Sequence, residues 1–378
     1  MSEIDPSTPE AAPPTSSPLL DPTLEPPSLT LPDAAPDTAL DATPTPAPLP
    51  PKPTLRPLFI GDDGLRAGWS VLLFLILLYL VGRAAGFLVK HLHLLPPPVK
   101  GQDQPMTARV SAIGEALSFT IVAIPAFLMS LIERRPFSRF GLSAARLLPD
   151  FLTGIFWGFT ALSALVGTLY LTHALAFDGL LLHGSVALLF ALKWGLVFLF
   201  VGLFEEFFTR GYLQYTVGRG VAGITRTFDP TNQYSHAIGF WVAAFIFSVC
   251  LFMGGHLLNP GENKIGIAAV GIVGIVFAFS LYRTGTLWWA IGVHTAWDWA
   301  QSYFYGTPDS GTHSVGHLIG THPIGSTLLS GGPDGPEGSI LVIPTLLLLA
   351  LVIHFTLPRR HYPLTPDQSP PLQSEYVP

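Results

Sequence analysis

Charged residues are scarce in this sequence of 378 residues, because Asp, Glu, Lys and Arg together make up only 12% of it. An average soluble globular protein carries about twice that share. Hydrophobic residues account for 49% of the chain, and Phe alone occurs 26 times. This composition excludes an ordinary soluble globule and points to a membrane protein.

Cysteine is nearly absent, with Cys250 as the single example. One thiol cannot form an intramolecular disulfide, a cysteine-based zinc cage or an iron–sulfur cluster. The net charge of -6 at pH 7 provides no basic surface for a nucleic acid. We therefore expect no nucleic-acid partner.

Lys and Arg are missing from the N-terminal segment before Lys52, whereas 17 of the 37 prolines fall within residues 1–58. A segment of this composition cannot bury a core, and it has neither the features of a secretory signal nor those of a transit peptide. We predict a disordered Pro-rich tail at 1–58, a transmembrane domain at 59–357 and a second disordered tail at 358–378.

Apolar segments of membrane-spanning length recur between the tails. A helix needs about 20 residues to cross about 30 Å of hydrocarbon, and the runs do not alternate as the strands of a barrel would. The predicted fold is an all-α polytopic bundle of about eight transmembrane helices. The predicted spans are 67–90, 109–132, 150–176, 186–216, 237–257, 265–283, 286–304 and 338–357.

The basic residues between these spans support an even number of crossings. Clusters of Lys and Arg alternate from loop to loop, as the positive-inside rule requires, and the first outer loop is the exception because it is also basic. We expect a multi-pass protein of a bacterial inner membrane with both termini in the cytoplasm.

Several ionisable residues lie inside the apolar spans. Each charge at a helix centre costs about 2.5 to 3.5 kcal/mol on insertion scales, so such residues usually serve a function. They are Glu205, Glu206 and Arg210 in the fourth span, His256 in the fifth, and His294 and Asp298 in the seventh.

Helical spacing assigns different partners to these residues. Glu206 and Arg210 are four residues apart, so they can form an ion pair on one face, whereas Glu205 is turned about 100° away and stays free. His294 and Asp298 are also four apart, so Asp298 can orient the imidazole. The cluster can converge only if the fourth span continues past Arg210, to about residue 220.

Two weaker patterns are set aside. The run Gly218-Arg-Gly-Val-Ala-Gly223 matches a dinucleotide-binding motif, but it follows a helix and lacks a βαβ unit. His313, His317 and His322 occupy a Gly-rich outer loop, where we interpret them as solvated side chains.

The polar cluster resembles the three motifs of the CPBP family, the CAAX-protease and bacteriocin-processing enzymes also called Abi proteins. The matching stretches are Glu205-Glu206-Phe-Phe-Thr-Arg210, Phe252-Met-Gly-Gly-His256 and His294-Thr-Ala-Trp-Asp298. The resemblance covers roughly residues 109–305. It implies an intramembrane endopeptidase, either of the glutamic type or a metalloprotease. The implied substrate is a membrane-associated peptide or protein that is CAAX-like or leader-peptide-like.

The same resemblance implies a role for each matching residue. Glu205 activates a water, His256 and His294 bind that water or a metal holding it, and Asp298 stabilises or orients. An ionised Asp cannot donate to an oxyanion as an Asn would, so we favour Asp298 as the orienter of His294. The oxyanion donor stays unassigned, with Arg210 as a candidate if its pairing with Glu206 is loose. A Zn²⁺ ion bound by Glu205, His256 and His294 is one form of the mechanism, and a metal-free site is the other.

Other functions use the same kind of cluster. A polar network can simply tie helices together in a non-catalytic scaffold or immunity protein. A proton- or metal-coupled carrier also places ionisable groups at mid-bilayer, although the two halves of this sequence show no repeat.

Overall fold

The computed structural model describes residues 55–61, 63–96, 106–259 and 261–359. Most of both predicted tails therefore lies outside the described residues. Within the last residues of the first predicted tail, a short helix, α1 (Arg56–Phe59), is formed.

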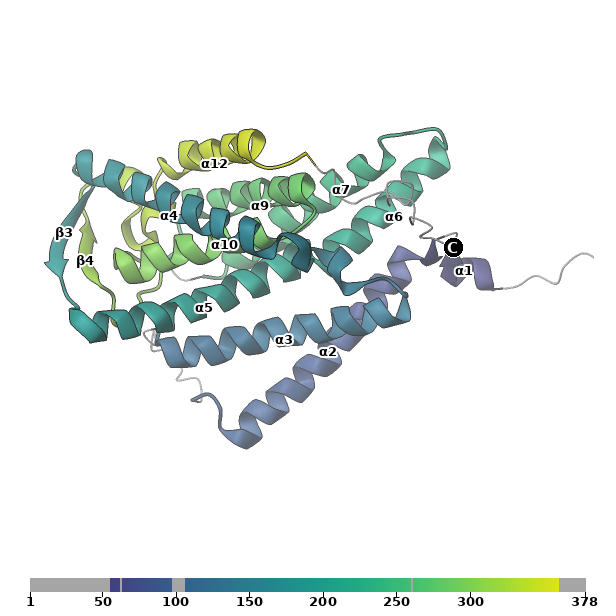
Figure 1. The fold of residues 1–378 in the computed structure, drawn as a ribbon, viewed down its shortest axis with the longest axis horizontal. Coiled ribbons are helices and arrows are strands. Elements are labelled where there is room, and N and C mark those ends of the chain that lie inside the picture. The colour runs from purple at the N-terminus through teal and green to yellow at the C-terminus, as the bar shows by residue number, and fades with distance from the viewer. Residues whose placement is uncertain (1–54, 62, 97–105, 260, 360–378) are drawn as a thin grey trace, which may run out of the picture. The chain divides into compact units, whose positions relative to one another are not determined.

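Helices dominate the described residues, and six helical segments are long and apolar enough to cross a membrane (Figure 1). The chain is an all-α polytopic membrane protein, as the sequence predicts. These segments are α2 (Ala67–Leu92), α3 (Ala108–Ile132), α4 (Leu147–Leu171) after the short turn η2 (Ala144–Arg146), α5 (Gly184–Arg210) with α6 (Tyr212–Phe228), α7 (Ser235–Phe245) with η3 (Ile246–Phe252) and α8 (Met253–His256), and α9 (Lys264–Thr284).

The last two predicted spans are helical but shorter. The seventh is α10 (Trp288–Asp298), which runs directly into the π-helix η4 (Trp299–Phe304), and the eighth is α12 (Val342–Thr356). Most residues of α10 and η4 are buried within the protein. This segment is therefore a core helix surrounded by other helices.

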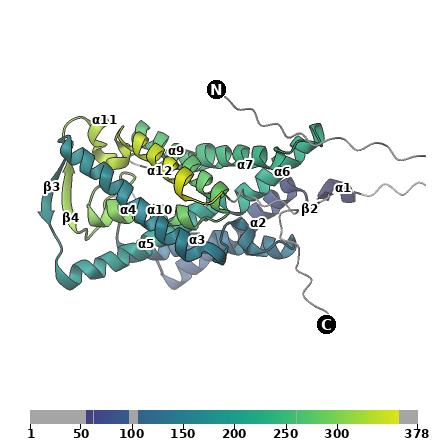
Figure 2. The same ribbon diagram turned by 45° about the horizontal axis from the view of Figure 1, so that its top comes forward.

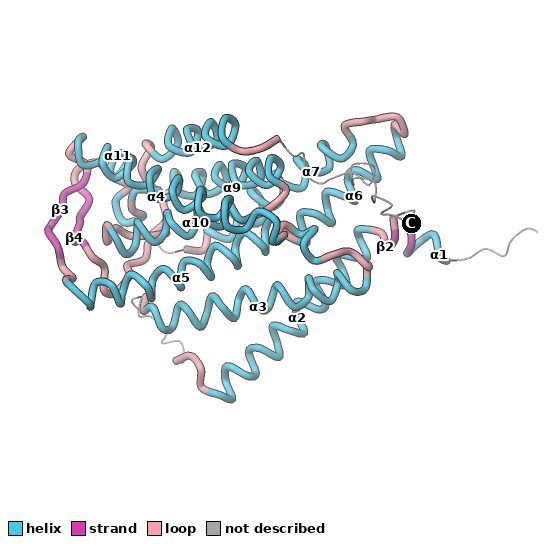
Figure 3. The backbone as a smooth tube through the Cα atoms, in the orientation of Figure 1, coloured by secondary structure: helices cyan, strands magenta, loops and turns pink. Residues whose placement is uncertain are grey.

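Short strands occur at two places where the sequence analysis predicted none (Figure 3). Strands β1 (Ile60–Gly61) and β2 (Gly64–Leu65) precede α2. Strands β3 (Leu175–Leu180) and β4 (Ile319–Pro323) pair antiparallel. The second pair joins the α4–α5 connection to the long segment before α12, which also contains α11 (Thr327–Ser330), η5 (Gly332–Asp334) and η6 (Pro336–Gly338).

Glycines bring α10 close to two neighbouring helices. A Cβ at Gly158 of α4 would lie 2.8 Å from the Cα of Val293. On α5, a Cβ at Gly202 would lie 3.2 Å from the carbonyl oxygen of Ile291. Small residues permit this backbone approach, and both views show α10 beside α4 and α5 (Figures 1 and 2).

The fourth span breaks once, at Gly211, before it continues as α6. The residue has φ -81° and ψ -122°, outside the helical region, and a Cβ there would collide with the carbonyl oxygen of Phe207. The predicted helical continuation past Arg210 is therefore present, with a bend that the sequence analysis did not predict.

Candidate active site

A cavity of about 350 Å³ opens among α3, α5, α9 and α10. Four of the predicted site residues line it: Glu205, His256, His294 and Asp298. They come from three separate helices, α5, α8 and α10. The structure thus brings these four residues to one enclosed space.

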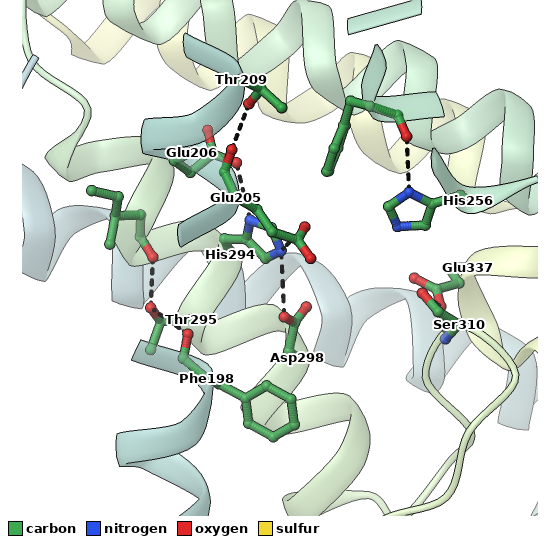
Figure 4. A network of polar contacts seen from close by, with 12 residues as sticks. Phe198, Glu205, Glu206, Thr209, His256, His294, Thr295, Asp298, Ser310 and Glu337 are labelled. Carbon is green, nitrogen blue, oxygen red and sulfur yellow. Dashed lines mark hydrogen bonds and ion pairs between the residues drawn. The ribbon is translucent and has the colours of Figure 1, made fainter. Parts of the chain in front are cut away.

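The imidazole of His294 is the centre of the polar contacts (Figure 4). Its Nδ1 lies 3.0 Å from Oε1 of Glu206. Its Nε2 lies 3.5 Å from Oε2 of Glu205 and 3.4 Å from Oδ2 of Asp298. Carboxylates therefore face both ring nitrogens.

This arrangement differs from the predicted orientation of His294. The sequence spacing assigned one ring nitrogen to Asp298 and the other to the site. In the structure the residue that contacts Nδ1 is Glu206, and Asp298 shares Nε2 with Glu205. Spacing within one helix could not predict this, because Glu206 belongs to α5 and reaches His294 across the helix contact at Gly202.

The predicted ion pair between Glu206 and Arg210 is present. Nη1 of Arg210 donates to Oε2 of Glu206 at 2.7 Å, and both side chains are fully buried. Arg210 also donates to the carbonyl of Gly274, and its guanidinium lies over the rings of Phe252 and Phe277. Arg210 does not line the cavity, so these contacts leave it supporting Glu206 rather than reaching a substrate.

The two adjacent glutamates differ in exposure. The Glu205 side chain is 27% exposed, against 0% for Glu206. Glu205 faces the cavity, and no described side chain neutralises it except His294. The predicted division between a free and a paired glutamate therefore matches the geometry.

His256 occupies a separate part of the cavity lining (Figure 4). Its Nδ1 lies 3.0 Å from the carbonyl oxygen of Phe252, so Nδ1–H donates to that backbone group and Nε2 remains for other partners. His256 lies four residues after the end of the π-helix η3, and the π-helix η4 begins directly after Asp298. π-Helical turns are frequent at functional sites because they change the direction of nearby side chains.

The predicted metal ligands do not form a metal-binding group. Among the described residues, no three or more His, Cys, Asp or Glu side chains are arranged to hold a metal ion. Figure 4 shows His256 apart from Glu205 and His294. The arrangement gives no support to a Zn²⁺ ion held by these three residues.

Three further carboxylates line the cavity and were missed by the sequence analysis: Glu115 of α3, and Asp309 and Glu337 of the segment before α12. Glu115 was detectable, because it is an ionisable residue inside an apolar span. Asp309 and Glu337 gave no such signal, since they lie in a polar segment. Glu337 accepts a hydrogen bond from the backbone N–H of Ser310, and Asp309 accepts one from Ser302 at 2.7 Å.

The three outer histidines do not come together. His317 contacts the carbonyl of Ser314, and His322 of β4 pairs with Asp178 of β3 at 2.8 Å. His313 is exposed. The interpretation as solvated side chains agrees with the exposure of His313 and His322, whereas His317 is half-buried.

Comparison with known proteins gives one match. Residues 187–300 match the family model described as type II CAAX prenyl endopeptidase Rce1-like. No curated protein and no solved structure matches the chain significantly. The matched segment begins in α5 and ends in η4, so it contains Glu205, His256, His294 and Asp298.

Proposed function

We propose that the chain belongs to the CPBP family of intramembrane proteases, because its residues 187–300 match the Rce1-like family model, and that it hydrolyses a peptide bond of a membrane-associated substrate. The observation that carries the proposal is the contact between the cavity-facing Glu205 and Nε2 of His294 at 3.5 Å. A carboxylate and an imidazole at this separation can bind the same water molecule between them.

In the proposed reaction, Glu205 removes a proton from a water held beside His294, and the water oxygen attacks the carbonyl carbon of the peptide bond. The carbonyl oxygen of the tetrahedral intermediate takes the negative charge. Glu205 then returns the proton to the nitrogen of the leaving amine, and the C–N bond breaks. The products are a new carboxylate and a new amine.

Glu206, Arg210 and Asp298 serve this reaction through His294. Glu206 is held by Arg210 and accepts the Nδ1–H of His294, which orients the ring. Asp298 faces Nε2, where it constrains the water-binding side of the ring. His256 lies at the cavity wall with Nε2 available as an acceptor, where it could bind the N–H of a substrate amide.

The walls of the cavity indicate the substrate class. Apolar side chains of α9, α10 and α12 form much of the lining, including Val270, Val273 and Leu346. Such walls suit an apolar peptide segment or an attached lipid chain. We propose a CAAX-like or leader-peptide-like substrate that reaches the site from the bilayer.

Substitution of the two central residues tests the proposal. We expect Glu205→Gln and His294→Ala to abolish cleavage of a membrane-anchored peptide, measured on the purified protein in lipid vesicles. The matched controls are Asp229→Asn and His354→Ala, which change exposed residues outside the cavity. Unfolding temperatures of the four variants exclude misfolding as the cause.

Either central variant that cleaves at the rate of the unsubstituted protein would refute the role assigned to that residue. A scaffold protein would show no cleavage at all. Repeating the assay with a strong chelator, and measuring metal in the purified protein, separates a metal-dependent reaction from a metal-free one.

A further inference from the structure

A second pocket, of about 540 Å³, lies where α2 begins and α6 ends. It shares no lining residue with the candidate active site. Three arginines line it: Arg66, Arg219 and Arg226. Asp63 is the only acidic side chain among the described lining residues, so the charged groups of this lining sum to a positive value.

The first turn of α2 supplies backbone donors to this pocket. Ala67 and Gly68 line it at the N-terminus of a helix of 26 residues. The N-cap residue, Arg66, forms no capping hydrogen bond through its side chain, and its Nε donates to the carbonyl of Pro57. The N–H groups of a first helical turn, together with the helix dipole, attract anions.

The wall formed by α6 contains the glycine pattern set aside in the sequence. Gly220 and Gly223 both line the pocket, one helical turn apart. The pattern lies within a helix, which excludes the dinucleotide-binding arrangement. Here Gly223 leaves open space on the helix surface, whereas a Cβ at Gly220 would lie 2.7 Å from the Cβ of Ala67, so Gly220 permits the close approach of α2.

Arg219 carries an unsatisfied donor. Its side chain is only 9% exposed; Nη1 pairs with Asp63 at 3.2 Å, and Nη2 donates to Leu65 and Ser70. Its Nε is buried and has no hydrogen-bond partner among the described residues. A buried cationic donor without an acceptor is unfavourable. An oxygen atom of a ligand could accept the missing hydrogen bond from this Nε–H.

We propose that this pocket binds a phosphate group, and that the phosphate belongs to the headgroup of an anionic lipid. The positive lining, the uncapped helix N-terminus and the unpaired Nε of Arg219 suit a small anion with several oxygens. Exposed apolar side chains flank the pocket, among them Trp69 and Leu72 on α2 and Ile224 and Phe228 on α6. α2 is long and apolar enough to cross a membrane, so a pocket at its N-terminus is expected at the membrane surface, where lipid phosphates are located.

The test measures lipid retention by the full-length protein. The protein is purified in detergent, titrated with dioleoyl phosphatidylglycerol or dioleoyl phosphatidylcholine, and analysed by native mass spectrometry. Arg226→Gln removes the positive charge of a side chain that contacts His236. Arg219→Lys keeps the positive charge but removes the Nε–H donor. Arg359→Gln, an exposed arginine outside the pocket, is the matched control.

We expect the unsubstituted protein to bind phosphatidylglycerol more tightly than phosphatidylcholine. Arg226→Gln and Arg219→Lys should each bind phosphatidylglycerol about tenfold more weakly than the unsubstituted protein, and Arg359→Gln should bind it equally well. Equal retention by all four proteins would overturn the proposal. A parallel titration with inorganic phosphate, followed by the unfolding temperature, distinguishes the source of the phosphate. Stabilisation by inorganic phosphate without retention of phosphatidylglycerol would overturn the assignment to a lipid.

Discussion

Glu205 and Glu206 are adjacent in sequence, yet their surroundings give them different chemistry. Glu206 is fully buried between Arg210 and His294, so its carboxylate is engaged on both sides. Glu205 projects into the cavity and contacts only the far nitrogen of the same imidazole. A rotation of about 100° along one helix thus separates a carboxylate buried against Arg210 and His294 from one that faces the cavity.

The buried ion pair predicts an asymmetric response to substitution. Glu206→Gln leaves Arg210 buried without a counter-charge, and we expect it to lower the free energy of unfolding by about 3–5 kcal/mol. The double variant Glu206→Gln/Arg210→Met removes both charges, so it should recover part of that loss. Chemical unfolding in detergent measures both.

A double variant no more stable than Glu206→Gln alone would contradict this interpretation of the pair. Cleavage should be weak in both variants, because each removes the carboxylate that orients His294. The stability comparison is therefore the informative measurement.

At the scale of helices, close packing against α10 positions His294. Gly154 and Gly158 of α4 contact one side of α10, and Gly202 of α5 contacts another. A bulkier residue at these points would move the helix that carries His294 and Asp298. The distances from His294 and Asp298 to Glu205 and Glu206 therefore depend on residues that do not line the cavity.

Two alanine substitutions on α4 test this dependence. Gly158→Ala places a methyl group against Val293, and we expect a loss of about 1–3 kcal/mol in stability and a lower kcat. Gly167→Ala on the same helix has no heavy atom within 4 Å of the new Cβ, so it should be neutral or slightly stabilising. Equal effects of the two substitutions on kcat would exclude helix packing as the cause.

The segment before α12 contains clustered acidic groups that respond to pH. Burial raises the pKa of Asp309 to about 6, and burial also raises the pKa of Asp334 to about 6. Burial raises the pKa of Glu337 as well, and the charges of Asp309 and Asp334 add to the effect. These carboxyl groups hold protons in the folded protein that the unfolded chain would release.

The sign of the resulting pH dependence follows from proton binding. Between pH 4 and about 6 the folded state binds more protons than the unfolded state, so the free energy of unfolding falls as the pH rises through this range. Asp309 and Asp334 each contribute on the order of 1–3 kcal/mol. Unfolding temperatures in detergent at pH 4.5 and 7.5 measure the slope, and Asp309→Asn and Asp334→Asn should each reduce it. An unchanged slope in both variants would be inconsistent with this assignment.

For the whole molecule, the eight crossings predicted from the sequence would place both termini on the same side of the membrane. We propose that this side is the cytoplasm of a bacterial cell. In a Cys250→Ser background, Ser2→Cys and Ser374→Cys should react with an impermeant maleimide from one side of sealed vesicles. Asp178→Cys, on the exposed strand β3, should react only from the other side. Labelling of the two termini from opposite sides would disprove the even number of crossings.

Much of the helical architecture was predictable because a bilayer requires long apolar helices, and such runs are visible in sequence. The eight predicted segments all correspond to helices. The bend at Gly211, the π-helices η3 and η4, and the pairing of β3 with β4 were not predicted. The pairing of β3 with β4 depends on contacts between residues far apart in the sequence, for which a local pattern has no signal.

The sequence by itself determined the membrane class, the helical spans and four of the ionisable residues that line the candidate site, because burial of a charge in an apolar helix is unfavourable and therefore conspicuous. It also determined the pairing of Glu206 with Arg210, which depends only on helical spacing. The tertiary structure alone decided that Glu206 orients His294, that Asp298 and Glu205 share the other ring nitrogen, and that His256 lies apart. Those relations depend on the rotation and separation of neighbouring helices, which are set by packing at Gly154, Gly158 and Gly202.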